Sequence, residues 1–174
     1  MTLCWHVDDL KVSHIEEDAI TDFCTCICGV FGYGTKITRV KVHDYLGMDM
    51  DWIQDGTMIV SMIKYPRKVI DNFPEVIRNT ATTPMSEHLF QVQDDKDRKL
   101  LPEEQAQHFH HTAAQLLFLC MRARPDIQPP VSFLTKRVRS PDKDYWGKLK
   151  WVLKYLKVTL YMKLYMSAYA LNVV

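Results

Sequence analysis

Two adjacent aspartates near the start of the chain have the clearest potential for chemistry. Asp8 and Asp9 follow His6 and Val7, and apolar stretches flank the four residues at 2–5 and 10–13. This pattern predicts a tight β-hairpin with both carboxylates at its turn. Adjacent carboxylates repel each other unless a cation lies between them, and Mg²⁺ prefers such oxygen ligands. Asp-Asp pairs are also common turn residues that hydrogen-bond the local backbone, and the four residues alone leave both interpretations open.

Several further blocks follow this hairpin in a fixed order. They are Asp44-Tyr45-Leu46-Gly47-Met48, Thr83-Pro84-Met85, residues 114–119 (AQLLFL), residues 122–127 (RARPDI) and residues 151–159 (WVLKYLKVT). Together with residues 5–11 (WHVDDLK), these blocks resemble the reverse transcriptase of Ty1/copia-type retrotransposons, and the resemblance spans nearly all of the chain. It implies an RNA-directed DNA polymerase encoded in the polyprotein of a transposable element.

The resemblance implies roles for individual residues. Asp8 and Asp9 would be the catalytic residues and the ligands of Mg²⁺, with Asp8 at both metal ions or directly beside them and Asp9 as the less direct partner. Leu46 and Gly47 would form a strand that grips the primer, where the small Gly lets the backbone approach closely. The implied partner is a primer–template duplex of RNA and DNA.

The chain also departs from the family pattern. His6 stands where most members carry Tyr, and Ala123 and Val158 replace the usual Thr and Gly. Two-metal phosphoryl transfer needs a further aspartate from a neighbouring strand, which lies upstream in polymerases of this class. Only five residues precede His6, so we expect that strand and the fingers to be missing, together with the ribonuclease H domain that follows in the family. The resemblance therefore predicts a fragment that is inactive alone and whose partner would be the missing N-terminal polymerase portion.

Composition agrees with a globular piece. The 174 residues are 47% hydrophobic and 25% charged, enough for a core of one domain or one and a half. No stretch reaches the roughly 18 apolar residues of a membrane span, and we expect no leader, because no charged segment followed by an apolar one stands at the start. We expect an intracellular protein, cytoplasmic or nuclear, with no membrane partner.

The net charge of +1 hides a division along the chain. Residues 1–120 contain 11 basic and 18 acidic residues, whereas residues 121–174 contain 11 basic and 3 acidic residues. Lys150, Lys154 and Lys157 share one face of an expected helix, where they could contact nucleic-acid phosphates. A solvated helix face is the alternative interpretation of the same lysines.

Three other groups of residues invite a functional interpretation. Cys24, Cys26 and Cys28 lack the spacing of a zinc site, and we expect reduced thiols. His108, His110 and His111 have no acid or Cys at ligand spacing, which favours the solvent side of a helix. The glycine-rich residues 29–36 lack the order of a phosphate-binding loop and are interpreted as the exit from a helix.

The expected fold class is α+β, a partial polymerase palm with antiparallel hairpins followed by a helical thumb and connection region. We expect a helix over 16–28, strands over 36–42, 44–54 and 58–62, and a short helix over 65–73. Asp55-Gly56 is a strong hairpin signal. Apolar residues at helical spacing predict three more helices, in 109–120, 127–138 and 145–156, and a final strand is expected over 160–166. The predicted units are residues 1–80 (partial palm), 81–102 (linker) and 103–174 (thumb and connection).

Three hypotheses follow from the sequence. The chain is the C-terminal part of a polymerase, or a non-catalytic nucleic-acid-binding module, or the remnant of a decayed element that does not fold stably.

Overall fold

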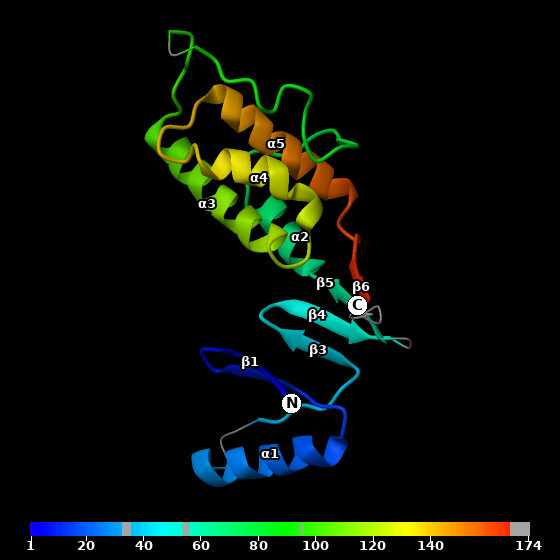
Figure 1. The fold of residues 1–174 in the computed structure, drawn as a ribbon. Helices are drawn as coiled ribbons and strands as arrows, with labels where there is room; N and C mark the ends of the chain where they lie inside the picture. The colour runs from blue at the N-terminus through cyan, green and yellow to red at the C-terminus, as the bar shows by residue number, and fades with distance from the viewer. Residues whose placement is uncertain (33–35, 54–55, 95, 168–174) are drawn as a thin grey trace, which may run out of the picture.

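The computed structural model describes residues 1–32, 36–53, 56–94 and 96–167. In this part of the chain, helices and two antiparallel sheets confirm the α+β class (Figure 1). The elements are β1 (Thr2–His6), β2 (Asp9–Ser13), α1 (Glu17–Phe31), β3 (Val42–Tyr45), β4 (Met48–Trp52), β5 (Thr57–Ser61), α2 (Lys64–Asp71), α3 (Glu103–Cys120), η2 (Pro125–Ile127), α4 (Gln128–Thr135), α5 (Lys143–Val158) and β6 (Leu164–Ser167).

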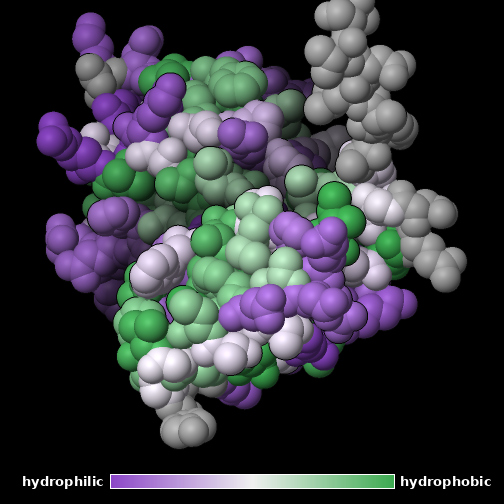
Figure 2. Space-filling view, turned by 60° about the horizontal axis from the view of Figure 1, so that its bottom comes forward, coloured by the Kyte–Doolittle hydropathy of each residue, from purple (hydrophilic) through white to green (hydrophobic). Residues whose placement is uncertain are grey.

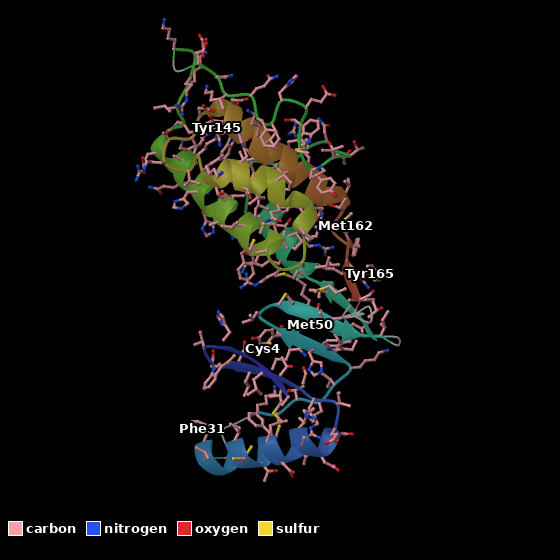
Figure 3. The ribbon with its side chains drawn as sticks, in the orientation of Figure 1. Cys4, Phe31, Met50, Tyr145, Met162 and Tyr165 are labelled. Atoms are coloured by element: carbon pink, nitrogen blue, oxygen red, sulfur yellow. The ribbon has the colours of Figure 1, made fainter. Side chains whose placement is uncertain are left out.

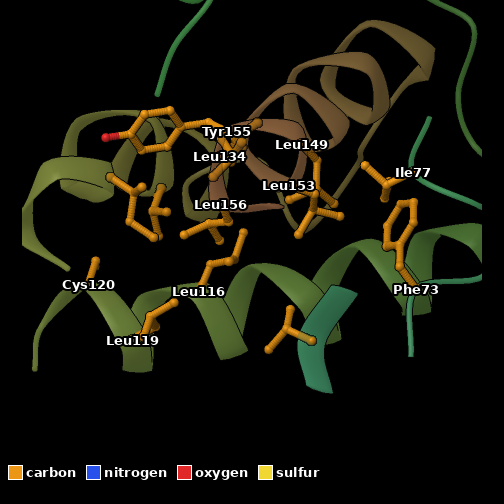
Figure 4. Close-up of a cluster of buried hydrophobic side chains, with 14 of the residues drawn as sticks. Phe73, Ile77, Leu116, Leu119, Cys120, Leu134, Leu149, Leu153, Tyr155 and Leu156 are labelled. Carbon is orange, nitrogen blue, oxygen red and sulfur yellow. The ribbon is translucent and has the colours of Figure 1, made fainter. Parts of the chain in front are cut away.

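The core lies among α2, α3, α4 and α5. The apolar stripes expected from the sequence face one another there (Figure 4), and their fully buried members include Leu116 on α3, Leu134 on α4 and Leu153 on α5. Burial of such a face supplies most of the stability of a short helix. The three helices predicted from apolar periodicity are thus confirmed, with α3 beginning six residues earlier than its stripe.

The segment between α2 and α3 contains no helix or named strand among its described residues, yet it packs onto this core. Leu89 is 1% exposed and Ala81 is 3% exposed. The backbone N–H of Leu101 donates to the carbonyl oxygen of Pro141 at 3.0 Å. Residues 81–102 therefore cover the helices, whereas the division of the chain into domains remains a prediction.

Strands β3, β4, β5 and β6 form one antiparallel sheet in that order. Strand β6 returns from the C-terminal part of the chain and pairs Leu164 with Val60 and Tyr165 with Ile59. One face of the sheet carries Met48, Met58, Val60 and Leu164, which pack against the helical core. The predicted strand at 58–62 is confirmed, and the expected final strand is found at 164–167.

The described residues of β1, β2 and α1 contribute none of the buried residues of the core. The β1–β2 hairpin and α1 lie at the opposite end of the molecule from the helical body (Figure 1), and Val60 is the first buried residue along the described chain. Large apolar side chains are open here, among them Trp5 (74% exposed) and Phe31 (68%). Figure 2, in which this end comes forward, shows hydrophobic surface between hydrophilic side chains.

The expected boundaries of two strands were wrong. Residues 36–41 form no strand, β3 begins at Val42, and the chain reverses at Leu46 and Gly47 instead of near His43. Both turn residues have positive φ, 55° for Leu46 and 74° for Gly47, as a tight two-residue hairpin turn requires. Of the predicted Asp55-Gly56 turn, Gly56 has a positive φ of 70° and Asp55 lies outside the described residues.

In the described residues, no helix is both long enough and apolar enough to span a bilayer.

Candidate active site

The β1–β2 hairpin places Asp8 at its tip. Trp5 pairs with Leu10 and His6 with Asp9, so Val7 and Asp8 form the two-residue turn. Val7 has a φ of 52°, the positive value that such turns need at their first central position, and a β-branched side chain is strained there. The indole Nε1 of Trp5 donates to the carbonyl oxygen of Val7 at 2.7 Å, which stabilises the turn. The predicted hairpin is confirmed.

Both carboxylates of the pair are open to solvent. Asp8 and Asp9 are exposed, and neither side chain has a hydrogen bond or ion pair with another described residue. The alternative role, in which an aspartate side chain caps the local backbone, is therefore not seen in this turn. Their oxygens can accept a hard cation such as Mg²⁺, but the described residues contain no cluster of three potential ligand side chains. The pair fits part of a metal site.

The hairpin contacts the four-stranded sheet through β3 and β4. The hydroxyl of Tyr45 donates to the carbonyl oxygen of Cys4 at 3.3 Å, and the Lys11 ammonium lies 5.1 Å from the centre of the Trp52 ring. Figure 3 shows Cys4 on the hairpin next to the sheet that carries Met50. In Figure 1, the β1–β2 and β3–β4 turns point to the same side of the molecule. Asp8 and the Leu46-Gly47 turn are thus carried by neighbouring hairpins.

The primer-grip interpretation had assumed that Leu46 and Gly47 belong to a strand. In the structure they form the turn between β3 and β4. Leu46 is half-buried and Gly47 is exposed. A Cβ added at Gly47 would meet only the Met62 methyl carbon, at 4.0 Å, so the requirement for glycine comes from its positive φ and not from a lack of space. Because Gly47 is exposed, its backbone is accessible to a bound molecule.

A second acidic group lies on the other face of this sheet and was not singled out in the sequence. Asp44 and Asp49 are directly opposite each other on β3 and β4, and Asp51 follows on the same face. Like charges in such a pair destabilise a sheet. One carboxylate oxygen of Asp51 is buried and has no hydrogen-bond partner in the described part of the chain. The signal in the sequence was the alternation Asp49-Met50-Asp51 within a strand.

Two of the three candidate phosphate-binding lysines hold another segment onto α5. The Lys150 ammonium lies 2.9 Å from a Glu75 carboxylate oxygen, and the Lys157 ammonium donates to the carbonyl oxygen of Ile77 at 2.8 Å. The hydrogen bond from Lys150 lowers the pKa of Glu75 despite its partial burial. Lys154 lies 5.9 Å from the centre of the Trp151 ring. These contacts give Lys150 and Lys157 a structural role that the sequence did not reveal.

The Arg-Pro-Asp block contains a buried ion pair. Arg124 is 2% exposed and donates to both carboxylate oxygens of Asp126, at 2.9 and 2.8 Å. It also donates to the carbonyl and hydroxyl oxygens of Thr159, at 2.9 and 2.7 Å. Burial raises the pKa of Asp126, but hydrogen bonds and the charge of Arg124 outweigh burial and hold this pKa below its usual value. The block therefore joins η2 to the end of α5.

The remaining candidate groups form no metal-binding cluster within the residues that the structure describes. Cys24, Cys26 and Cys28 lie on α1, which confirms the predicted helix, and their thiols are free. Burial raises the pKa of the Cys120 thiol. All three histidines lie on α3, where His110 and His111 are exposed, as expected, and His108 is half-buried. Helix α1 ends at Gly32, whose φ of 79° confirms the glycine exit, while residues 33–35 lie outside the described part.

Comparison with known proteins relates the chain to retrotransposon Pol polyproteins. It is 26% identical over 133 residues to the retrovirus-related Pol polyprotein from transposon TNT 1-94 of Nicotiana tabacum, an alignment that covers 72% of this chain and 9% of that protein. It is 28% identical over 121 residues to a putative transposon Ty5-1 protein of Saccharomyces cerevisiae, with 68% of this chain and 37% of that protein covered. The chain thus spans only a minor part of each relative.

No family model matches the chain, and no solved structure matches it. The relationship to Pol polyproteins supports a retrotransposon origin.

Proposed function

We propose that the chain is part of an RNA-directed DNA polymerase of a Ty1/copia-type retrotransposon and that Asp8 and Asp9 belong to its catalytic metal site. The observation that carries this proposal is the hairpin turn, which presents Asp8 at its tip and Asp9 at the first position of β2 with both carboxylates unpaired among the described residues. The relationship to Pol polyproteins and the order of the sequence blocks support it.

In this proposal the two aspartates hold Mg²⁺ through their carboxylate oxygens. The metal would activate the primer 3′-hydroxyl and neutralise charge on the transferring phosphate. Asp8 is the principal ligand because it occupies the tip of the turn, whereas Asp9 is already part of the strand pair with His6. We further propose that another part of the polyprotein supplies the remaining carboxylate.

The β3–β4 turn would position the primer. Leu46 and Gly47 lie at a hairpin turn next to the one that carries Asp8, and Tyr45 links the two hairpins through its bond to Cys4. The exposed backbone of Gly47 can approach a primer strand closely. Their role is to hold the primer terminus in line with the phosphate that it attacks.

A second candidate function is binding of nucleic acid without catalysis. The excess of eight positive charges in residues 121–174 favours it, because neutralisation of phosphates by Lys and Arg supplies most non-specific affinity. This function requires neither Mg²⁺ nor Asp8.

Primer extension tests the proposed polymerase function. The chain is joined to the sequence that precedes the matched region in a related Pol polyprotein, and Mg²⁺-dependent extension on an RNA template is measured for Asp8→Asn and for the matched control Asp97→Asn, an exposed aspartate near the start of α3. We expect Asp8→Asn to abolish extension and Asp97→Asn to leave it unchanged. Full Mg²⁺-dependent extension by Asp8→Asn would contradict the metal assignment.

A further inference from the structure

Helix α2 carries a stripe of cations on its open face. Lys64, Arg67 and Lys68 recur at the spacing i, i+3, i+4 and are all exposed. The opposite side of the helix is fixed in the core by Val69, which is 2% exposed. The helix that carries these three cations is therefore held in place by the core.

The stripe lines an open cleft with a volume of about 500 Å³. Tyr161, from the segment between α5 and β6, forms its other side, and the hydroxyl of Tyr161 accepts a hydrogen bond from the Arg67 guanidinium at 3.2 Å. This bond fixes Arg67 at the edge of the cleft while its other N–H groups remain available as donors. Asn72 adds an amide that can donate or accept.

The charge in this cleft is not neutralised within the described part of the chain. No carboxylate there lies within 4.0 Å of the nitrogens of Lys64, Arg67 or Lys68, although Asp71 lines one end of the cleft. In contrast, Lys150 and Lys157 on α5 already bind Glu75 and Ile77. Lys64 and Lys68 on α2, unlike Lys150 and Lys157, can therefore contact a polyanion without losing a contact to another described residue.

We propose that the α2 cleft binds the phosphodiester backbone of a nucleic-acid duplex. Lys64 and Lys68 are about 6 Å apart along the helix axis, and one duplex strand presents a phosphate about every 3.4 Å of axis, so the stripe can contact two successive phosphates. Recognition is independent of sequence because the contacts are made to phosphates. This inference rests on the proposed function for the kind of partner, but it places the contact on residues that the sequence did not single out.

Duplex binding by the 174-residue chain tests the proposal. Fluorescence anisotropy of a short labelled DNA duplex is measured from about 50 to 200 mM salt for the unaltered chain, for Lys64→Gln with Lys68→Gln, and for the control Lys99→Gln with Lys143→Gln. The control removes the same charge from two exposed lysines, Lys143 at the start of α5 and Lys99, whose backbone carbonyl accepts a hydrogen bond from the Lys143 N–H at 3.0 Å. We expect the α2 double variant to lose about tenfold in affinity at the lowest salt and to reduce the slope of log K against log salt by about 2.

Equal losses in the two double variants, or no loss in either, would overturn the α2 site. A parallel titration with inorganic phosphate distinguishes the two sources of phosphate, because saturable binding of phosphate by a chain that does not bind duplex would also overturn the proposal. These outcomes are separate from the polymerase test: unchanged duplex binding by the α2 variant leaves the requirement for Asp8 in extension intact, and an active Asp8→Asn protein leaves the α2 site intact.

Discussion

The position of Asp8 depends on the backbone of its neighbour. A two-residue hairpin turn needs positive φ at its first central residue, and in this chain that residue is Val7, with a φ of 52°. Such a conformation costs of order 1–3 kcal/mol for a residue other than glycine and persists only where the surroundings hold it. The strand pairs on both sides and the bond from Trp5 to the Val7 carbonyl supply that support.

At the residue scale, candidate site residues could be read from the sequence more easily than the contacts between side chains. The Asp-Asp pair could be found because adjacent carboxylates between apolar stretches are a local pattern. The partners of Lys150 and Lys157 could not, because Glu75 and Ile77 are 75 and 80 positions away and lie in a segment without periodicity. The buried state of Arg124 was equally hidden, since arginine is almost never fully buried unless it is paired.

Replacement of Arg124 by Ala should destabilise the helical body. The change removes a buried bidentate partner of Asp126 and two bonds to Thr159, and it leaves the Asp126 carboxylate without its counter-charge. Breaking a buried ion pair in this way costs about 3–5 kcal/mol. We expect a decrease of that size in the free energy of unfolding, measured by denaturant titration.

The control is Arg139→Ala, which removes an exposed arginine and should change the free energy of unfolding by less than about 0.5 kcal/mol. A similar small effect for Arg124→Ala would show that the network contributes little to stability.

At the scale of elements, periodicity predicted helices well and strand boundaries poorly. The stripes on α3, α4 and α5 are long enough for the 3.6-residue period to be unambiguous, and their members are buried. The β3–β4 hairpin was misplaced because its turn residues, Leu46 and Gly47, lack the Asn-Gly or Asp-Gly signal and were assigned to a strand by resemblance. A hairpin turn that lacks the common Asn-Gly or Asp-Gly pair is therefore difficult to locate from the local sequence.

Carboxylates that join irregular segments to α5 should make this packing sensitive to acid. Glu75 pairs with Lys150 on α5, and Asp126 pairs with Arg124, which binds Thr159 at the end of α5. The pKa of each carboxyl is held below its ordinary value of 4.5 or 3.8. The unfolded chain therefore binds more protons at low pH, so the stabilisation is complete above these ordinary values and is lost as the pH falls through the lowered ones.

The free energy of unfolding, measured against pH below about 5, should fall less steeply in Asp126→Asn and in Glu75→Gln than in the unaltered chain. Glu87→Gln, at an exposed position, is the control and should keep the original slope. Identical slopes in all four proteins would show that these two carboxyls do not govern the acid response.

At the scale of the whole molecule, the core and the candidate chemistry lie in different places. The helical body buries its apolar faces, whereas the described residues of β1, β2 and α1 include no buried one and leave Trp5 and Phe31 exposed. The candidate duplex-binding cleft on α2 belongs to the helical body, and β5 connects α2 directly to the sheet that contacts the Asp8 hairpin. A nucleic acid held at α2 would thus be held by the body, while the hairpin would supply the chemistry.

The assignment of Asp8 and Asp9 as metal ligands is tested most directly by a Mn²⁺ titration of the chain followed by NMR, because this paramagnetic ion broadens the signals of nearby nuclei and substitutes for Mg²⁺ at oxygen ligands. We expect the signals of residues 6–10 to broaden first and the Asp8→Asn substitution to remove the effect. The opposing aspartates Asp44 and Asp49 are the internal comparison. Broadening that begins at that pair, with residues 6–10 unaffected, would contradict the assignment of Asp8 and Asp9 as metal ligands.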